Sequence, residues 1–91
     1  MRTLEEFRFN VNEDALTADG FEDAIIGYIE RHSLTPVVCY DYDECIKILV
    51  ERDGMSYADA VECFEFNTVG AYVGENGPVF LHRLEKDDAQ E

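Results

Sequence analysis

Residues 41–68 read DYDECIKILVERDGMSYADAVECFEFNT, and this stretch decides the fold class because it contains two helices with recognisable ends. Asp41 or Asp43 can accept hydrogen bonds from the first free amides of a helix that continues through Asp53. Gly54 then stands where a glycine with positive φ commonly ends a helix. The spacing therefore predicts a helix of about three turns.

A further helix begins directly after that glycine. Ser56 and Asp59 match the Ser/Thr-x-x-Asp/Glu pattern in which a hydroxyl caps the first turn. The connection through Met55 is so short that the two helices must form an antiparallel pair. The apolar residues that we expect on their inner faces are Ile46, Leu49, Val50, Tyr57, Ala60, Val61, Phe64 and Thr68.

Two elements are predicted before this pair. In residues 6–11, apolar and polar side chains alternate, which is typical of a half-buried strand. After a polar loop, Asp19 and Glu22 can cap a helix that runs to about His32. Its apolar residues have helical spacing and are Phe21, Ala24, Ile25, Tyr28 and Ile29.

The remaining segments favour strands. Residues 37–40 are a short β-prone run, and residues 69–73 and 79–84 flank the turn formers at 74–78. The Asn-Gly pair in that turn tolerates positive φ, which favours a two-residue hairpin. Residues 85–91, EKDDAQE, are expected to be a flexible acidic tail.

These patterns predict an α+β fold: three helices packed on a small antiparallel sheet with a C-terminal β-hairpin, which the strand at residues 6–11 can extend. We expect one domain over residues 1–84, since a chain of 91 residues has room for one core. The predicted core consists of Phe21, Ile25, Tyr28, Ile29, Ile46, Leu49, Val50, Tyr57, Val61, Phe64, Val73 and Phe80.

The charge balance limits the function classes. Twenty-one acidic residues against seven Lys and Arg give a formal net charge of −14. Binding to nucleic-acid phosphates or to anionic membranes requires clustered basic residues, so we expect neither. The imbalance is regional, because no Lys or Arg lies between Arg8 and Arg31 or between Arg52 and Arg83. The alternatives are an acidic surface that binds a basic protein and simple solubility from net charge.

Cysteines and the N-terminus indicate a cytoplasmic protein. Cys39, Cys45 and Cys63 form no CxxC pair and are odd in number, which argues against a disulfide scaffold and a zinc site. We expect buried free thiols in a reducing compartment. Residues 1–10 lack the apolar core of a signal peptide, and no apolar run is long enough to span a bilayer.

The most enzyme-like string is VVCYDYD at residues 37–43. A strand that runs into Asp-x-Asp is similar to the nucleophile motif of haloacid-dehalogenase-type phosphatases, but Glu44 and Cys45 replace the Gly and Thr expected there. We therefore interpret the aspartates as helix caps and expect no enzymatic activity and no cofactor. A loose divalent-metal site formed by Asp41, Asp43 and Glu44 is a further hypothesis.

Two apolar residues fall outside the predicted helix faces. At about 100° per residue, Phe66 lies opposite the inner face of the third helix, and Ile48 lies opposite that of the second. One interpretation is that the third helix ends before Phe66 or that the sheet covers these faces. The other is that Phe66 and Ile48 are apolar anchors of a contact surface surrounded by acidic residues. The predicted partner-binding residues are Glu44, Ile48, Glu51, Asp59, Glu62, Glu65 and Phe66.

Three stretches carry a family resemblance: ERDGMSY at 51–57, FEFN at 64–67, and GAYVGE at 70–75 with Pro78. The chain resembles a family of small acidic proteins encoded by tailed bacteriophages and prophages, over roughly residues 21–81. The resemblance implies a phage or prophage origin and a bacterial cytoplasm. It implies no activity, because none is established for the family.

Three function hypotheses follow. The first is a phage accessory protein that binds, and inhibits, a basic host protein of defence or nucleic-acid-handling machinery, with an acidic surface that imitates nucleic acid. The second is a homodimer or larger homo-oligomer in which Ile48 and Phe66 meet their own copies across a two-fold axis. The third is a small-molecule or metal-binding protein built around Asp41, Asp43 and Glu44.

Overall fold

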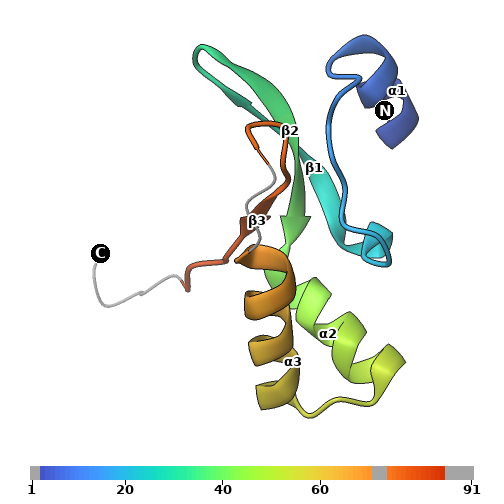
Figure 1. Cartoon of the computed structure of the whole chain (residues 1–91), viewed down its shortest axis with the longest axis vertical. Helices are drawn as coiled ribbons and strands as arrows, with labels where there is room; N and C mark the ends of the chain where they lie inside the picture. Colours follow the sequence, from blue (N-terminus) through green and yellow to red (C-terminus); the bar gives the residue numbers. More distant parts are fainter. Residues whose placement is uncertain (1–2, 71–73, 86–91) are drawn as a thin grey trace.

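The computed structural model of the protein describes residues 3–70 and 74–85. The elements follow in the order α1 (Leu4–Asn10), the short 3-10 helix η1 (Glu22–Ala24), β1 (Ile25–Arg31), β2 (Leu34–Asp41), α2 (Tyr42–Asp53), α3 (Tyr57–Phe64), the π-helical turn η2 (Glu65–Val69) and β3 (Val79–Leu81). Within these ranges the fold is α+β, as predicted, with three α-helices and a small sheet (Figure 1). Except for Glu85, the predicted acidic tail lies outside the described residues.

The sheet is mixed, so the prediction of an antiparallel sheet was wrong. Its strand order is β1-β2-β3, with β2 in the centre. β1 and β2 form an antiparallel hairpin, in which Tyr28 lies opposite Val38. β2 and β3 run parallel, and Tyr40 lies opposite Phe80. The hairpin of the fold is therefore β1–β2, with Ser33 at a φ of 65° in its turn.

The helix pair explains why β3 is parallel to β2. Two adjacent parallel strands need a crossover connection of about a dozen residues or more, because the chain must return to the starting edge. Here α2 and α3 form part of that connection, and Figure 1 shows both helices beyond the end of β2, with β3 beside β2 and pointing the same way.

The ends of α2 and α3 confirm the capping predictions. Asp41 caps α2, and its side chain accepts hydrogen bonds from two amides of the first turn, at 3.0 and 3.4 Å. Gly54 ends this helix with a φ of 71°, a conformation that glycine adopts without strain. The hydroxyl of Ser56 accepts from the amide of Asp59 at 3.1 Å and begins α3.

The first predicted strand was wrong, because residues 6–11 belong mostly to helix α1. The Thr3 hydroxyl accepts from the Glu6 amide at 3.1 Å, and the Glu6 carboxylate accepts from the Thr3 amide at 2.9 Å. This reciprocal capping box starts the helix. Phe7 is buried while Phe9 is 88% exposed, so the two aromatic side chains do not share a face as they would in a half-buried strand.

The first predicted helix was also wrong, because the segment that ends near His32 forms η1 and β1. The strand has an irregularity at Ile26, where the register with β2 shifts by one residue. As a result, Ile25 and Tyr28 lie on the same face although they are three residues apart. The irregularity in β1 therefore gives its buried residues the i, i+3 spacing that is typical of a helix.

The predicted C-terminal hairpin is not shown. Val69 belongs to η2, residues 71–73 lie outside the described residues, and Val79–Leu81 pair with β2. The Asn-Gly segment does turn, since the amide of Gly77 donates to the carbonyl of Gly74 at 3.1 Å. This turn therefore leads into a strand that pairs with β2.

Phe64 of α3 is 1% exposed and packs in the core beside residues of the central strand β2. The Phe64 ring makes edge contacts with Phe21, Tyr42 and Phe80 at centroid distances of 5.2, 5.6 and 5.3 Å. These four rings come from four separate segments, so their packing joins the N-terminal loop, both ends of the crossover and β3. The buried core cluster comprises Phe7, Ala15, Phe21, Ala24, Val38, Tyr40, Tyr42, Cys45, Ile46, Leu49, Ala60 and Phe64.

Most of the predicted core residues belong to this core. Tyr57 and Ile29 do not, since they are 66% and 40% exposed, and Val73 lies outside the described residues. Tyr57 is the first residue of α3, where its side chain extends beyond the core. The predicted residues that are buried or packed against the core are Phe21, Ile25, Tyr28, Ile46, Leu49, Val50, Val61, Phe64 and Phe80.

Phe64→Ala is expected to lower the free energy of unfolding by about 3–5 kcal/mol, because it removes a buried ring and leaves a cavity. The matched control is Phe66→Ala, which removes the same side chain from an 82% exposed position and should change stability by no more than about 0.5 kcal/mol. Urea denaturation of both variants measures the difference. Equal losses of stability would contradict this description of the core.

Candidate interaction surface

Side chains of α3 and its neighbours line a shallow hollow on the outside of the molecule. We call this hollow the α3 surface, and it consists of Met55, Asp59, Glu62, Cys63, Phe66 and Asn67. It brings together Asp59, Glu62 and Phe66, three of the predicted partner-binding residues. The hollow thus combines two carboxylates with an aromatic ring.

Phe66 is the main apolar feature of this surface. It is 82% exposed, whereas Phe64, two residues earlier, is 1% exposed. Phe66 lies in η2, whose wide turn closes with a hydrogen bond of 2.8 Å from the amide of Gly70 to the carbonyl of Glu65. A Cβ at Gly70 would lie 2.9 Å from that carbonyl oxygen, so the turn requires glycine there. Such π-helical turns occur frequently at functional sites.

Within the described residues, the acids of the α3 surface form no ion pair. Among the described residues, ion pairs join only Arg52 to Asp53 at 3.0 Å and Arg83 to Asp41 at 2.6 Å. Asp59 and Glu62 are exposed and take part in neither. Their charges are therefore available to a partner with a basic surface.

The other predicted partner-binding residues lie elsewhere. Ile48 is half-buried and packs against the core cluster, so it is not an exposed anchor. Glu44 and Glu51 are exposed on α2 but do not line the α3 surface. Glu65 accepts a hydrogen bond of 2.5 Å from the Tyr42 hydroxyl and is thereby engaged within the fold. The structure consequently groups only part of the predicted set.

Of the three proposed metal ligands, Asp41 has a structural role. One carboxylate oxygen of Asp41 caps α2, and the other accepts from Arg83 at 2.6 and 3.2 Å. The hydrogen bond from Arg83, together with those from two backbone amides, holds the pKa of Asp41 below its usual value. In the described part of the chain, no group of three or more His, Cys, Asp or Glu side chains is placed to hold a metal ion.

Tyr42 connects the start of α2 to η2 and to the segment after β3. Its ring stacks on that of His82 with centroids 4.1 Å apart and an interplanar angle of 30°. Burial, followed by the hydrogen bond to Glu65, raises the pKa of Tyr42 to about 12. The hydroxyl therefore remains protonated at neutral pH and acts as a hydrogen-bond donor.

Two of the three thiols are deeply buried, as predicted. Burial raises the pKa of Cys39, and it raises the pKa of Cys45 to about 12. Both thiols are thus protonated and poorly nucleophilic at neutral pH. Cys63 is half-buried in the α3 surface, where its sulfur accepts a hydrogen bond of 3.4 Å from the side-chain amide nitrogen of Asn67.

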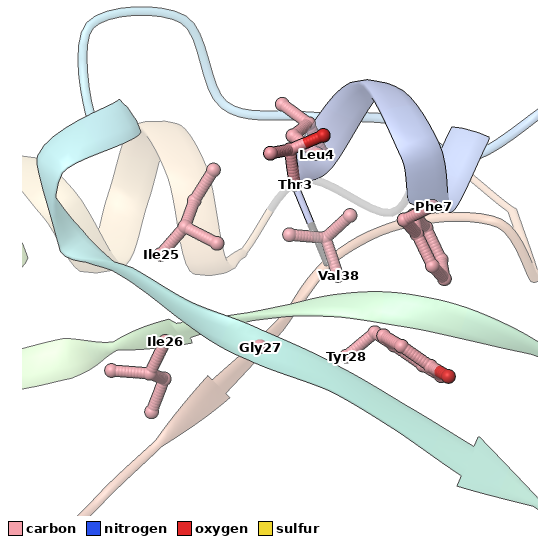
Figure 2. A pocket seen from close by; sticks show the side chains of 8 residues that line it. All are labelled: Thr3, Leu4, Phe7, Ile25, Ile26, Gly27, Tyr28 and Val38. Atoms are coloured by element: carbon pink, nitrogen blue, oxygen red, sulfur yellow. The ribbon is translucent and has the colours of Figure 1, made fainter. Parts of the chain in front are cut away.

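A second hollow, which the sequence did not predict, lies between α1 and β1. Its volume is about 160 Å³. Figure 2 shows Phe7 pointing from α1 toward the strand, while Ile25 and Val38 point from the sheet toward the helix. The sequence patterns predicted a strand where α1 lies and a helix where β1 lies. Contact between these side chains was therefore not expected. The lining residues are Thr3, Leu4, Phe7, Ile25, Ile26, Gly27, Tyr28 and Val38.

No family model, curated protein or solved structure matches this chain. None of the helices in the described ranges is long and apolar enough to cross a lipid bilayer. The assignment of function consequently depends on the chemistry of the surfaces described above.

Asp41→Asn should remove the ion pair with Arg83 but keep the cap of α2, because asparagine is also a good N-cap residue. At neutral pH we expect it to lower the free energy of unfolding by about 1–3 kcal/mol through loss of a charge-assisted hydrogen bond. Asp41→Ala, which also removes the cap, should cost about 1 kcal/mol more. Urea denaturation measures both.

The same pair predicts a pH dependence. Because the folded-state pKa of Asp41 lies below its ordinary value of 3.8, the stabilisation is complete above pH 3.8 and is lost as pH falls through the lower, folded-state pKa. The stability difference between wild type and Asp41→Asn should therefore shrink in acid. A difference that stays constant in acid would contradict this role of the ion pair.

Proposed function

We propose that this chain is a non-enzymatic interaction protein that binds a basic partner protein through the α3 surface. The observation that carries the proposal is Phe66, an aromatic side chain that is 82% exposed in the same hollow as Asp59 and Glu62, whose carboxylates form no ion pair within the described residues. Contact sites of this kind combine a central aromatic anchor with a polar rim.

The two kinds of side chain have separate roles in binding. Burial of the Phe66 ring against a partner contributes about 2–3 kcal/mol of affinity. The carboxylates mainly accelerate association with a basic surface and disfavour acidic partners, and this attraction weakens with salt. The net charge of −14 extends the attraction over the whole molecule.

The partner class follows from this charge and from the resemblance to proteins of tailed phages. We propose a phage or prophage origin and a basic host protein as the partner, of the kind that handles nucleic acid or takes part in defence. Occupation of its cationic groove by an acidic protein would inhibit it. The site of action is then the cytoplasm of the bacterial host.

The same charges argue against a homodimer on this surface. A two-fold axis through Phe66 would place Asp59 and Glu62 of both copies around one contact, and like charges at an interface are unfavourable. The second predicted anchor, Ile48, is half-buried against the core. A basic partner satisfies both the ring and the carboxylates, so we prefer it.

The test is a pull-down from bacterial lysate with the tagged wild-type protein and three variants, at low and moderate salt. Glu62→Lys and Phe66→Ala should each weaken binding of the captured protein at least tenfold, as measured afterwards by calorimetry with that protein purified. The matched control is Glu13→Lys, which makes the same charge change on an exposed loop residue outside the α3 surface.

Three results would contradict the proposal. One is that no captured protein is lost as salt rises. Another is that Glu13→Lys weakens binding as much as Glu62→Lys, because the effect would then be one of net charge alone. The third is that Phe66→Ala leaves the affinity unchanged, because the ring would then not be buried by the partner.

A further inference from the structure

The outer edge of β1 has no strand partner among the described residues. β1 is an edge strand of the sheet and pairs only with β2. Over residues 3–70 and 74–85, no backbone hydrogen bond joins its other edge to another segment. Between its two irregularities, residues 27–29 keep a regular register with β2. This stretch therefore presents unpaired backbone groups in strand geometry.

Gly27 begins this regular stretch. Its φ lies outside the positive region, and a Cβ built on it would meet nothing within 4 Å. Neither backbone conformation nor crowding within the fold therefore requires glycine here. Glycine inside a strand often marks a place where another backbone or a ligand approaches closely, because no side chain shields the main chain.

The hollow between α1 and β1 borders the same stretch. Its volume of about 160 Å³ is similar to that of an apolar cavity that holds one benzene ring, about 150 Å³. None of its eight lining side chains is charged. In Figure 2, Ile25, Val38 and Phe7 point into the space between strand and helix. The hollow thus has the size and chemistry for one apolar side chain.

Acidic residues stand at the two ends of the strand. Asp23 precedes β1 and Glu30 lies near its end, and both are exposed and outside the ion pairs of the described residues. The guanidinium of Arg31 donates to the carbonyls of Thr35 and Glu75 at 3.0 and 3.1 Å, so it is engaged with other segments. The carboxylates of Asp23 and Glu30 complement a basic segment that lies along the strand.

We infer that β1 and the adjoining hollow form a docking site for an extended peptide segment of a partner protein. The segment adds a strand to β1 along residues 27–29, places an apolar side chain in the hollow, and carries Lys or Arg toward Asp23 and Glu30. Backbone hydrogen bonds supply affinity, and the pocket supplies specificity, as in other cases of strand addition. This site is separate from the α3 surface and does not depend on it.

A second copy of this chain is the alternative occupant of the edge. Antiparallel pairing of β1 with its own copy would gather Asp23 and Glu30 of both chains at one interface, where like charges are unfavourable. A basic foreign segment avoids this repulsion, so we commit to it.

The experiment is a selection from a displayed library of random seven-residue peptides. Peptides are selected on the wild-type protein and counter-selected on Leu4→Trp, which adds bulk to a residue that lines the hollow. Circular dichroism checks that the variant folds. We expect enriched peptides with an apolar residue flanked by Lys or Arg, and at least tenfold weaker binding to Leu4→Trp. The matched control is Leu16→Trp, because Leu16 lies outside this hollow, and it should bind as wild type does.

Backbone pairing is tested with the strongest peptide after synthesis. N-methylation of the amides that face β1 should weaken binding at least tenfold, even where Leu4→Trp fails to fold. Hydrogen exchange at residues 27–29 should slow when the unmodified peptide binds. The Phe66→Ala variant should bind it unchanged, which separates this site from the α3 surface.

Three outcomes would overturn the inference. The first is that the selection enriches no peptide that binds wild type better than Leu4→Trp. The second is that the N-methylated peptides bind as tightly as the unmodified one. The third is that light scattering shows a dimer in which the β1 amides are protected from exchange without any peptide. In the last case, the second copy occupies the edge.

Discussion

The carboxylate of Asp41 ties the junction of β2 and α2 to a segment 42 residues later in the chain. It ends the central strand β2, caps α2 with one oxygen, and pairs through the other with Arg83 beyond β3. Next to it, Tyr42 contacts His82 and Glu65. The position of β3, which shares only three residue pairs with β2, therefore depends on this junction as well as on the packing of Phe80. Side-chain contacts beyond the end of β3 matter because so few backbone hydrogen bonds join this short strand to β2.

This arrangement also determines which surfaces remain free. The helix pair returns the chain to the sheet and directs the inner face of α3 into the core through Phe64, so Asp59, Glu62 and Phe66 face outward. The addition of β3 beside β2 leaves β1 as an edge strand. Both candidate contact sites thus follow from the same topology. One offers an aromatic ring between acids, and the other offers backbone groups beside an apolar hollow.

The parts of the fold that could be predicted are those with local signals. The ends of α2 and α3 depend on single capping residues, so Asp41, Gly54 and Ser56 were sufficient. The N-terminal half has misleading local signals, because the irregularity at Ile26 gives Ile25 and Tyr28 the spacing of a helix. The parallel partner of β3 depends on contacts between distant segments, which no local pattern encodes.

The candidate site was predictable to a similar degree. The helical position of Phe66 beside Asp59 and Glu62 was sufficient to place it outside, whereas Ile48 packs against the core because α2 is covered on more than one side. The hollow beside β1 required the correct assignment of two elements. The exposed ring and the acids of α3 add little to the stability of the fold, because the ring stays 82% exposed and neighbouring carboxylates repel each other. Solubility would account for the acids but not for the ring. The basic partner that we propose would account for both, because it would cover the ring and pair with the carboxylates.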